Sequence, residues 1–182
     1  MAIGWRVGIR FAFVRIVSMT LKEKISQDYK EAFKAKDESR VSTLRMLNST
    51  VKNKELEKRS KLIKSGNQEG DLDSRSALND EEMIEVVFGE VKKRRDSINQ
   101  YRQGGRPELA SQEEVEAAIL TAYLPRQMAE EEIRNQVLEA IKESGASGSQ
   151  DLGKLMKVLM PRVKGKADGG LVNKIAKEEL EK

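Results

Sequence analysis

The stretch "YLPRQMAEEEI", Tyr123–Ile133, separates two helical regions of the chain. Pro125 disfavours a helical conformation at the residue before it, so the helix that approaches this point ends here. Glu130–Glu132 suit the first turn of a new helix, because acidic side chains complement the positive end of a helix dipole. We therefore place a domain boundary at Pro125, between a domain at 19–124 and a domain at 125–182.

Apolar residues recur at helical spacing on both sides of this boundary. The N-terminal stripes are Leu21, Ile25, Tyr29 and Phe33; Val41, Leu44, Leu47 and Val51; Ile84, Val87, Phe88, Val91 and Ile98; and Val115, Ala118, Ile119 and Ala122. The C-terminal stripes are Ile133, Val137 and Ile141; Leu152, Leu155, Met156 and Leu159; and Leu171, Ile175 and Leu180. The sequence predicts an all-α fold of two small helical domains, four helices followed by three, with Tyr29, Phe33 and Phe88 in the core.

Local signals predict where several helices begin and end. Asn79 and Ser111 are each followed three residues later by a glutamate, which is the pattern of a capping box. Gly145 closes one helix, and Pro161 is expected to stop the next. Asp168 is the expected N-cap of the last helix.

Two features interrupt this regular pattern. The stretch Ser65–Ser76 is polar and contains glycine, so we expect a loop. Arg95 lies on the third stripe where an apolar residue is expected. Its aliphatic stem either covers apolar surface, or this position meets the second domain.

The composition excludes most of the usual catalytic side chains. The chain of 182 residues contains neither cysteine nor histidine. Disulfides, thiolate metal sites and a cysteine nucleophile are therefore excluded, and so are a histidine general base and histidine metal ligands. Carboxylates and lysines remain available for chemistry. We predict no catalytic residues, no cofactor and no metal.

Residues 1–18, "MAIGWRVGIRFAFVRIVS", differ from the rest of the chain. They contain three arginines and no acidic residue, and their longest apolar run is Phe11–Val14. This run is too short for a secretory signal or a membrane helix. We expect initiation at Met19, with 1–18 as a non-native or disordered extension, and a cytoplasmic protein without membrane contact. The alternative is an organellar presequence, because the stretch is rich in arginine and lacks acids.

Positive charge gathers near the C-terminus. The whole chain has a formal charge of +4, whereas residues 105–148 carry net −5 and residues 149–182 net +3. Lys154–Lys166 contain five basic residues and no acid. Such a segment predicts an anionic partner, although a solvated charged face gives the same pattern.

The basic segment continues into "KGKADGGLVNKI", Lys164–Ile175, where a helix is expected to begin. A helix start offers free N–H groups, and glycines let a phosphate approach the backbone. The spacing is not that of a nucleotide-binding P-loop, and a capped turn between two helices explains the same residues. The candidate nucleic-acid-binding residues are Lys154, Lys157, Arg162, Lys164, Lys166, Gly169, Gly170 and Lys174.

Two other charged clusters have simpler interpretations. Lys92–Arg95 span more than one helical turn, so their side chains cannot all face one ligand, and we interpret them mainly as a solvated face. Glu130–Glu132 could bind a cation but suit a helix start better.

Several motifs resemble those of the YqeY-like family, which is related to the tail domain of GatB, a subunit of glutamine-dependent tRNA amidotransferase. They are "YLPRQMAEEEI", "LMPRVKGKADGGLVNKI", "MTLKEKISQDYKEAFKAKDESRVSTLRML", "EVVFGEVKKRRDSINQYRQGGRPEL" and "EVEAAILTAYLP". The resemblance covers Met19 to about Leu180. Ala129 departs from the usual Ser or Thr cap, and the loop at Ser65–Ser76 is long for the family.

The resemblance implies two all-α domains and a link to tRNA, because the amidotransferase tail is implicated in holding the outer corner of tRNA. It also implies association with an amidotransferase, a carbon–nitrogen ligase that uses glutamine as amido donor. The active sites of that enzyme lie in a separate kinase-like domain and in another subunit, so kinship does not transfer its activity. We expect a non-catalytic module that binds tRNA or other structured RNA. The alternatives are a module docking on proteins of translation or aminoacyl-tRNA enzymes, or a ligase component.

Overall fold

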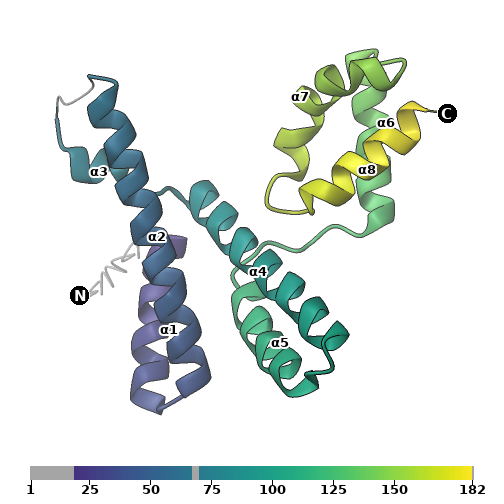
Figure 1. Ribbon diagram of the computed structural model, residues 1–182. Coiled ribbons are helices and arrows are strands. Elements are labelled where there is room, and N and C mark those ends of the chain that lie inside the picture. Colours follow the sequence, from purple (N-terminus) through teal and green to yellow (C-terminus); the bar gives the residue numbers. More distant parts are fainter. Residues whose placement is uncertain (1–18, 67–69, 182) are drawn as a thin grey trace, which may run out of the picture.

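In the computed structural model, which describes residues 19–66 and 70–181, every regular element is a helix (Figure 1). This confirms the all-α prediction. The α-helices are α1 (Leu21–Ala35), α2 (Glu38–Lys64), α3 (Leu72–Ser76), α4 (Asp80–Gln103), α5 (Pro107–Thr121), α6 (Glu130–Ser144), α7 (Leu152–Val163) and α8 (Gly169–Leu180). A 3₁₀ turn, η1 (Ser149–Asp151), leads into α7. The predictions for residues 1–18 lie outside the described residues.

Two separate clusters of buried apolar residues lie on either side of Pro125. The first joins α1, α2, α4 and the end of α5 through Ile25, Leu44, Leu47, Val51, Met83, Val87, Val91, Leu120 and Tyr123. The second joins α6, α7 and α8 and includes Ile133, Val137, Leu155, Leu159, Val163, Val172 and Ile175. The clusters share no residue. The independence of two domains at 19–124 and 125–182 stays a prediction.

Apart from the short α3, which packs on α2, the helices form two antiparallel pairs, α1–α2 and α4–α5, and a C-terminal group of α6, α7 and α8 (Figure 1). The α1–α2 pair crosses the α4–α5 pair, and the segment after α5 leads to α6. Helix α4 therefore lies between α2 and the C-terminal helices. This position makes α4 the surface on which the basic C-terminal turn rests.

Tyr123 ties the end of the α4–α5 pair to the first two helices. Its hydroxyl donates a hydrogen bond to the Asp28 carboxylate at 2.6 Å, and Arg40 lies 3.4 Å from the same carboxylate. Burial, reinforced by the bond to Asp28, raises the pKa of Tyr123 to about 12. The phenol therefore stays protonated at neutral pH and remains a donor.

The predicted core is correct for most stripes but wrong at Phe33 and on α5, where Val115, Ala118 and Ala122 are exposed and Ala110 and Leu120 are buried instead. The Phe33 ring is 64% exposed, whereas Ile25 and Ala32 are buried. Each step of four residues turns a helix by 400°, so a strict four-residue spacing drifts by about 40° per step. Ala32 lies seven residues after Ile25, which keeps it on the buried face.

Two predicted helix ends are also wrong. Helix α5 begins at Pro107 and not at Ser111, because proline is already shaped for the first position of a helix. Helix α7 continues past Pro161 to Val163. The Val163 side chain is buried in the C-terminal core, and Lys164 N–H donates to the Met160 carbonyl at 3.0 Å, so the last turn remains closed.

The stretch predicted to be a loop, Ser65–Ser76, contains the short helix α3. Asp71 caps it by accepting hydrogen bonds from the N–H groups of Asp73 and Ser74. Residues 67–69 of this stretch lie outside the described residues. By contrast, the capping box of Asn79 and Glu82 and the closure of α6 at Gly145 are confirmed.

Candidate nucleic-acid interface

A short turn, residues 164–168, joins α7 to α8 and carries the centre of the predicted site. Gly165 has a left-handed backbone with φ +71°, which favours glycine. Two bonds from the segment before α6 hold the turn: Gln127 Nε2 donates to the Gly165 carbonyl at 3.0 Å, and Met128 N–H donates to the Lys166 carbonyl at 2.7 Å. The peptide groups before and after the Lys166 Cα are therefore both held in place by that segment.

Asp168 caps α8, as the sequence predicts. Its carboxylate accepts a hydrogen bond from Leu171 N–H at 2.9 Å. Burial alone would raise the pKa of Asp168. The bond from Leu171 and the charge of Lys92, 3.6 Å away, outweigh burial and lower the pKa. Asp168 is therefore an anion at neutral pH and already occupies part of the helix start.

The two predicted glycines differ in how open they are. A Cβ added at Gly169 would have no heavy atom within 4 Å, whereas one at Gly170 would lie 2.9 Å from the Asp168 carboxylate. A phosphate can therefore approach the backbone at Gly169 more readily than at Gly170.

Three of the predicted cations are paired with carboxylates. Lys164 Nζ lies 2.5 Å from Glu85 of α4, and this hydrogen bond raises the pKa of Lys164. Arg162 pairs with Glu143 on α6. Lys174 lies 3.8 Å from Glu178 of its own helix.

The other three predicted cations have no carboxylate partner among the residues that the structure describes. Lys154 donates to the Gly145 carbonyl at 3.5 Å. Lys157 and Lys166 are exposed and form no ion pair within the described ranges. These two lysines are the ones most available to an added anion.

Lys157 and Lys166 line the same groove, together with Lys164. The groove has a volume of about 710 Å³ and lies between the first half of α4 and the end of α7. Ile84, Met156, Met160, Pro161 and Gly165 supply its apolar and backbone surface, and Glu81 and Glu85 stand on the α4 side. We call these lining residues the α4–α7 groove. One wall is basic and the other is acidic.

Sequence reasoning missed the contribution of α4 to this region. Lys92 lies beside the cap of α8 through its contact with Asp168, and Glu85 holds Lys164. Both contacts join residues more than seventy positions apart in the sequence, so no local spacing could reveal them.

The four residues Lys92–Arg95 diverge around α4, as their spacing predicts. Lys93 pairs with Glu90 at 2.7 Å. The Arg94 side chain is largely buried, and its Nε lies 2.9 Å from Glu116 on α5. Arg95, expected either to cover apolar surface or to lie at a domain seam, is exposed. Arg94 is therefore the buried arginine of this cluster.

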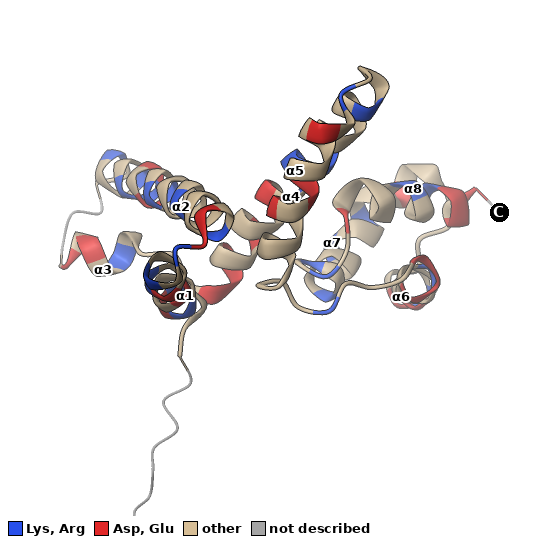
Figure 2. Ribbon diagram, turned by 90° about the horizontal axis from the view of Figure 1, so that it is seen from below, with Lys and Arg blue, Asp and Glu red and all other residues tan. Residues whose placement is uncertain are grey.

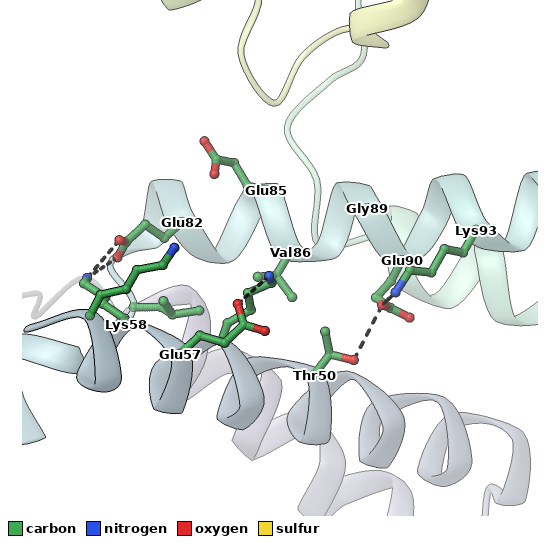
Figure 3. A pocket seen from close by; sticks show the side chains of 12 residues that line it. Thr50, Glu57, Lys58, Glu82, Glu85, Val86, Gly89, Glu90 and Lys93 are labelled. Carbon is green, nitrogen blue, oxygen red and sulfur yellow. Dashed lines mark hydrogen bonds and ion pairs between the residues drawn. The ribbon is translucent and has the colours of Figure 1, made fainter. Parts of the chain in front are cut away.

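A second groove, of about 610 Å³, lies where α2 and α4 diverge (Figure 3). Lys58 pairs with both oxygens of Glu82 at 2.7 and 2.8 Å, and Glu90 accepts from Lys93. Thr50 lies 3.5 Å from Glu90. The charges of this groove are thus largely satisfied by each other.

Neither a metal-binding cluster nor a membrane-spanning helix is found in the part of the chain that the structure describes. Within 19–66 and 70–181, no group of three or more histidine, cysteine, aspartate or glutamate side chains is placed to hold a metal ion. No helix in the same ranges has the length and apolar character needed to cross a bilayer.

Glu130, Glu131 and Glu132 lie in the first turn of α6, as predicted. The Glu132 carboxylate accepts a hydrogen bond from Ala129 N–H at 2.8 Å.

Comparison with known proteins supports the motif resemblance. The family model described as "Yqey-like protein" matches residues 22–180. Proteins named "Altered inheritance of mitochondria protein 41, mitochondrial" are 34% identical over 100 residues in Eremothecium gossypii and 30% identical over 101 residues in Vanderwaltozyma polyspora. Each match covers 55% of this chain and 46% of the relative. The chain thus aligns with about half the length of these relatives.

Proposed function

The chain belongs to the YqeY-like family, and from this premise we propose that it is a non-catalytic module that binds tRNA or similarly structured RNA through the α7–α8 region. The observation that carries this proposal is the pair of exposed lysines, Lys157 and Lys166, which line one groove and have no ion pair among the described residues. Gly169 adds an open backbone position at the start of α8.

Such a site recognises phosphate groups and not bases. Lysine ammonium groups and a helix start attract phosphate oxygens without reading sequence. None of the described residues that line this groove is aromatic, so the groove offers no stacking platform for bases. We therefore expect binding that depends on RNA shape and differs little between tRNA species.

The test is tRNA binding by the double variant Lys157→Ala, Lys166→Ala at several salt concentrations. We expect weaker binding and a log–log salt slope that is flatter by about one unit per lost phosphate contact. The matched control is Lys30→Ala, Lys34→Ala on α1, where both lysines are also exposed. Equal losses of tRNA affinity in the two variants would indicate nonspecific charge attraction alone. If the wild type binds no tRNA at low salt, the proposal is refuted.

A second candidate is a protein-interaction module, favoured by the mixed charges of the groove between α2 and α4. Glu57, Glu82 and Glu90 line that groove and would repel a nucleic acid there, whereas a peptide with both charges fits it. A pull-down from lysate with and without nuclease separates the two candidates. Partners that survive nuclease treatment support the second one.

The location of the protein is also a proposal. The names of the relatives place those proteins in mitochondria, and this favours the presequence alternative for residues 1–18 over the cytoplasmic prediction. A fluorescent fusion with and without residues 1–18 tests this choice.

A further inference from the structure

The outward face of α2 carries positive charge that lies outside the α4–α7 groove. Arg45, Lys52 and Arg59 follow one another at intervals of seven residues, which is nearly two helical turns. All three are exposed and lie on one side of the helix, about 10 Å apart along its axis. With Ser49 and Ser60 between them, we call these five residues the α2 basic face.

The two glutamates beside the middle of this face point away from it, whereas Glu38, seven residues before Arg45, lies in line with its N-terminal end. Glu55 and Glu57 lie roughly a quarter turn to either side of its centre. Glu55 pairs with Lys22 at 2.5 Å, and Glu57 pairs with Lys54 at 2.8 Å. Between Arg45 and Arg59, helix α2 therefore presents cations outward and pairs its two carboxylates at the sides.

Two of the three cations on the face are unpaired within the described residues. Arg59 lies 2.7 Å from Asp73 of α3. Arg45 and Lys52 form no ion pair with any residue that the structure describes. Figure 2 shows bands of Lys and Arg along α2, and α2 and the C-terminal helices lie on opposite sides of α4 (Figures 1 and 2). The α2 basic face is thus separate from the α4–α7 groove.

We propose that the α2 basic face is a second contact for the same structured RNA, binding its phosphate backbone; this inference rests on the proposed function. The argument is charge complementarity: two unpaired cations and a third partly engaged one are aligned without a carboxylate between them. The Ser60 hydroxyl is a further donor, whereas the Ser49 hydroxyl already donates to the Arg45 carbonyl at 3.1 Å. Arginine is suited to phosphate because its guanidinium presents parallel N–H donors.

The apolar content of the face is too small to favour a membrane instead. Leu56 and Ile63 are the aliphatic residues in line with it, at 51% and 41% exposure, so part of each side chain is already covered. Interfacial helices that hold to lipid present a wide apolar side opposite their charges. Here the charges and the two aliphatic residues share one side, which suits a polar, phosphate-rich partner.

The test compares two double variants of α2 in the full chain. Arg45→Gln, Lys52→Gln removes two charges from the face, and Lys54→Gln, Lys61→Gln removes two from the side that lines the groove between α2 and α4. We expect the first variant to weaken tRNA binding by about ten- to a hundredfold at 0.1 M salt and to lower the salt slope by about two, since each lost phosphate contact contributes about one unit. The control should change little. Circular dichroism verifies that both variants keep their helix content.

Two further arms distinguish the ways in which the inference can fail. If the wild type binds tRNA and both variants lose affinity equally, the α2 basic face is not a contact, and the Lys157 and Lys166 result alone decides the proposed function. If the wild type binds no tRNA at low salt, both ideas fail. Binding to phosphatidylserine vesicles that Leu56→Ser, Ile63→Ser abolishes, with tRNA binding insensitive to Arg45 and Lys52, would assign the face to a membrane and overturn the inference.

Discussion

Replacing Gly165 with alanine should disturb the contact between the α7–α8 turn and α4. Two effects add at this position. The left-handed backbone, φ +71°, costs a residue with a Cβ about 1–2 kcal/mol. The new Cβ would also lie 2.5 Å from Ile84 Cγ2, roughly 1 Å closer than an ordinary carbon contact. Overpacking of this kind costs about 1–3 kcal/mol, so we expect a total loss of about 2–5 kcal/mol in the free energy of unfolding.

Urea unfolding followed by circular dichroism measures this loss, and Gly145 provides a matched control. Gly145 also has a left-handed backbone, φ +62°, but the nearest atom to an added Cβ is the mobile Lys154 Nζ at 3.8 Å. Gly145→Ala should therefore cost only the backbone share, about 1–2 kcal/mol.

A double-mutant cycle isolates the steric share. Ile84→Ala removes the Cγ2 atom that the new Cβ would meet, so Gly165→Ala should cost about 1–3 kcal/mol less in that background. The reasoning is refuted if Gly165→Ala costs no more than Gly145→Ala, or if its cost is the same with and without Ile84.

Two other variants test the electrostatics of the fold and of the site. Tyr123→Phe removes the hydroxyl that donates to Asp28, and we expect a loss of about 1–2 kcal/mol at neutral pH. The pKa of Tyr123 is raised to about 12 from an ordinary value near 10, so the contribution of its hydroxyl to stability is fully present below pH 10 and is lost as pH rises through 12. The urea midpoints of wild type and variant should therefore converge over that range. Midpoints that keep a constant difference would contradict this. Glu85→Gln should free Lys164 and tighten tRNA binding, with a salt slope steeper by about one unit. Glu81→Gln in the same groove is its control, and an equal gain from both would show only a general charge effect.

Features set by neighbouring residues could be predicted from the sequence. The Asn79 cap, the Gly145 closure and the Asp168 cap each depend on groups within about four positions, so the residue types carry the information. Where two local signals competed, the prediction failed: Pro107 and Ser111 both mark a helix start, and proline prevailed because it occupies the first helical position itself.

The candidate site was only partly predictable, because its neighbours come from a distant part of the chain. The sequence shows that Lys164 is basic and that Gly165 is flexible. It does not show that Glu85 lies against Lys164 or that Ile84 lies against Gly165. Periodicity likewise pointed to Arg95 as the unusual arginine of α4. Arg94 is the one that is buried, since the carboxylates of α5 lie on its side of the helix.

The pairing of cations in the α7–α8 region bears on how it would bind RNA. A phosphate must displace Glu85 from Lys164 and Glu143 from Arg162 before these side chains can serve as ligands. Exposed ion pairs of this kind contribute at most about 1 kcal/mol each, so the displacement is a modest cost beside the release of counterions from RNA. Lys157 and Lys166 carry no such cost within the described structure. On the proposed function these two lysines make the first contacts with phosphate. Lys164 and Arg162 bind phosphate once Glu85 and Glu143 have been displaced from them. The acidic wall of the groove therefore weakens binding without preventing it.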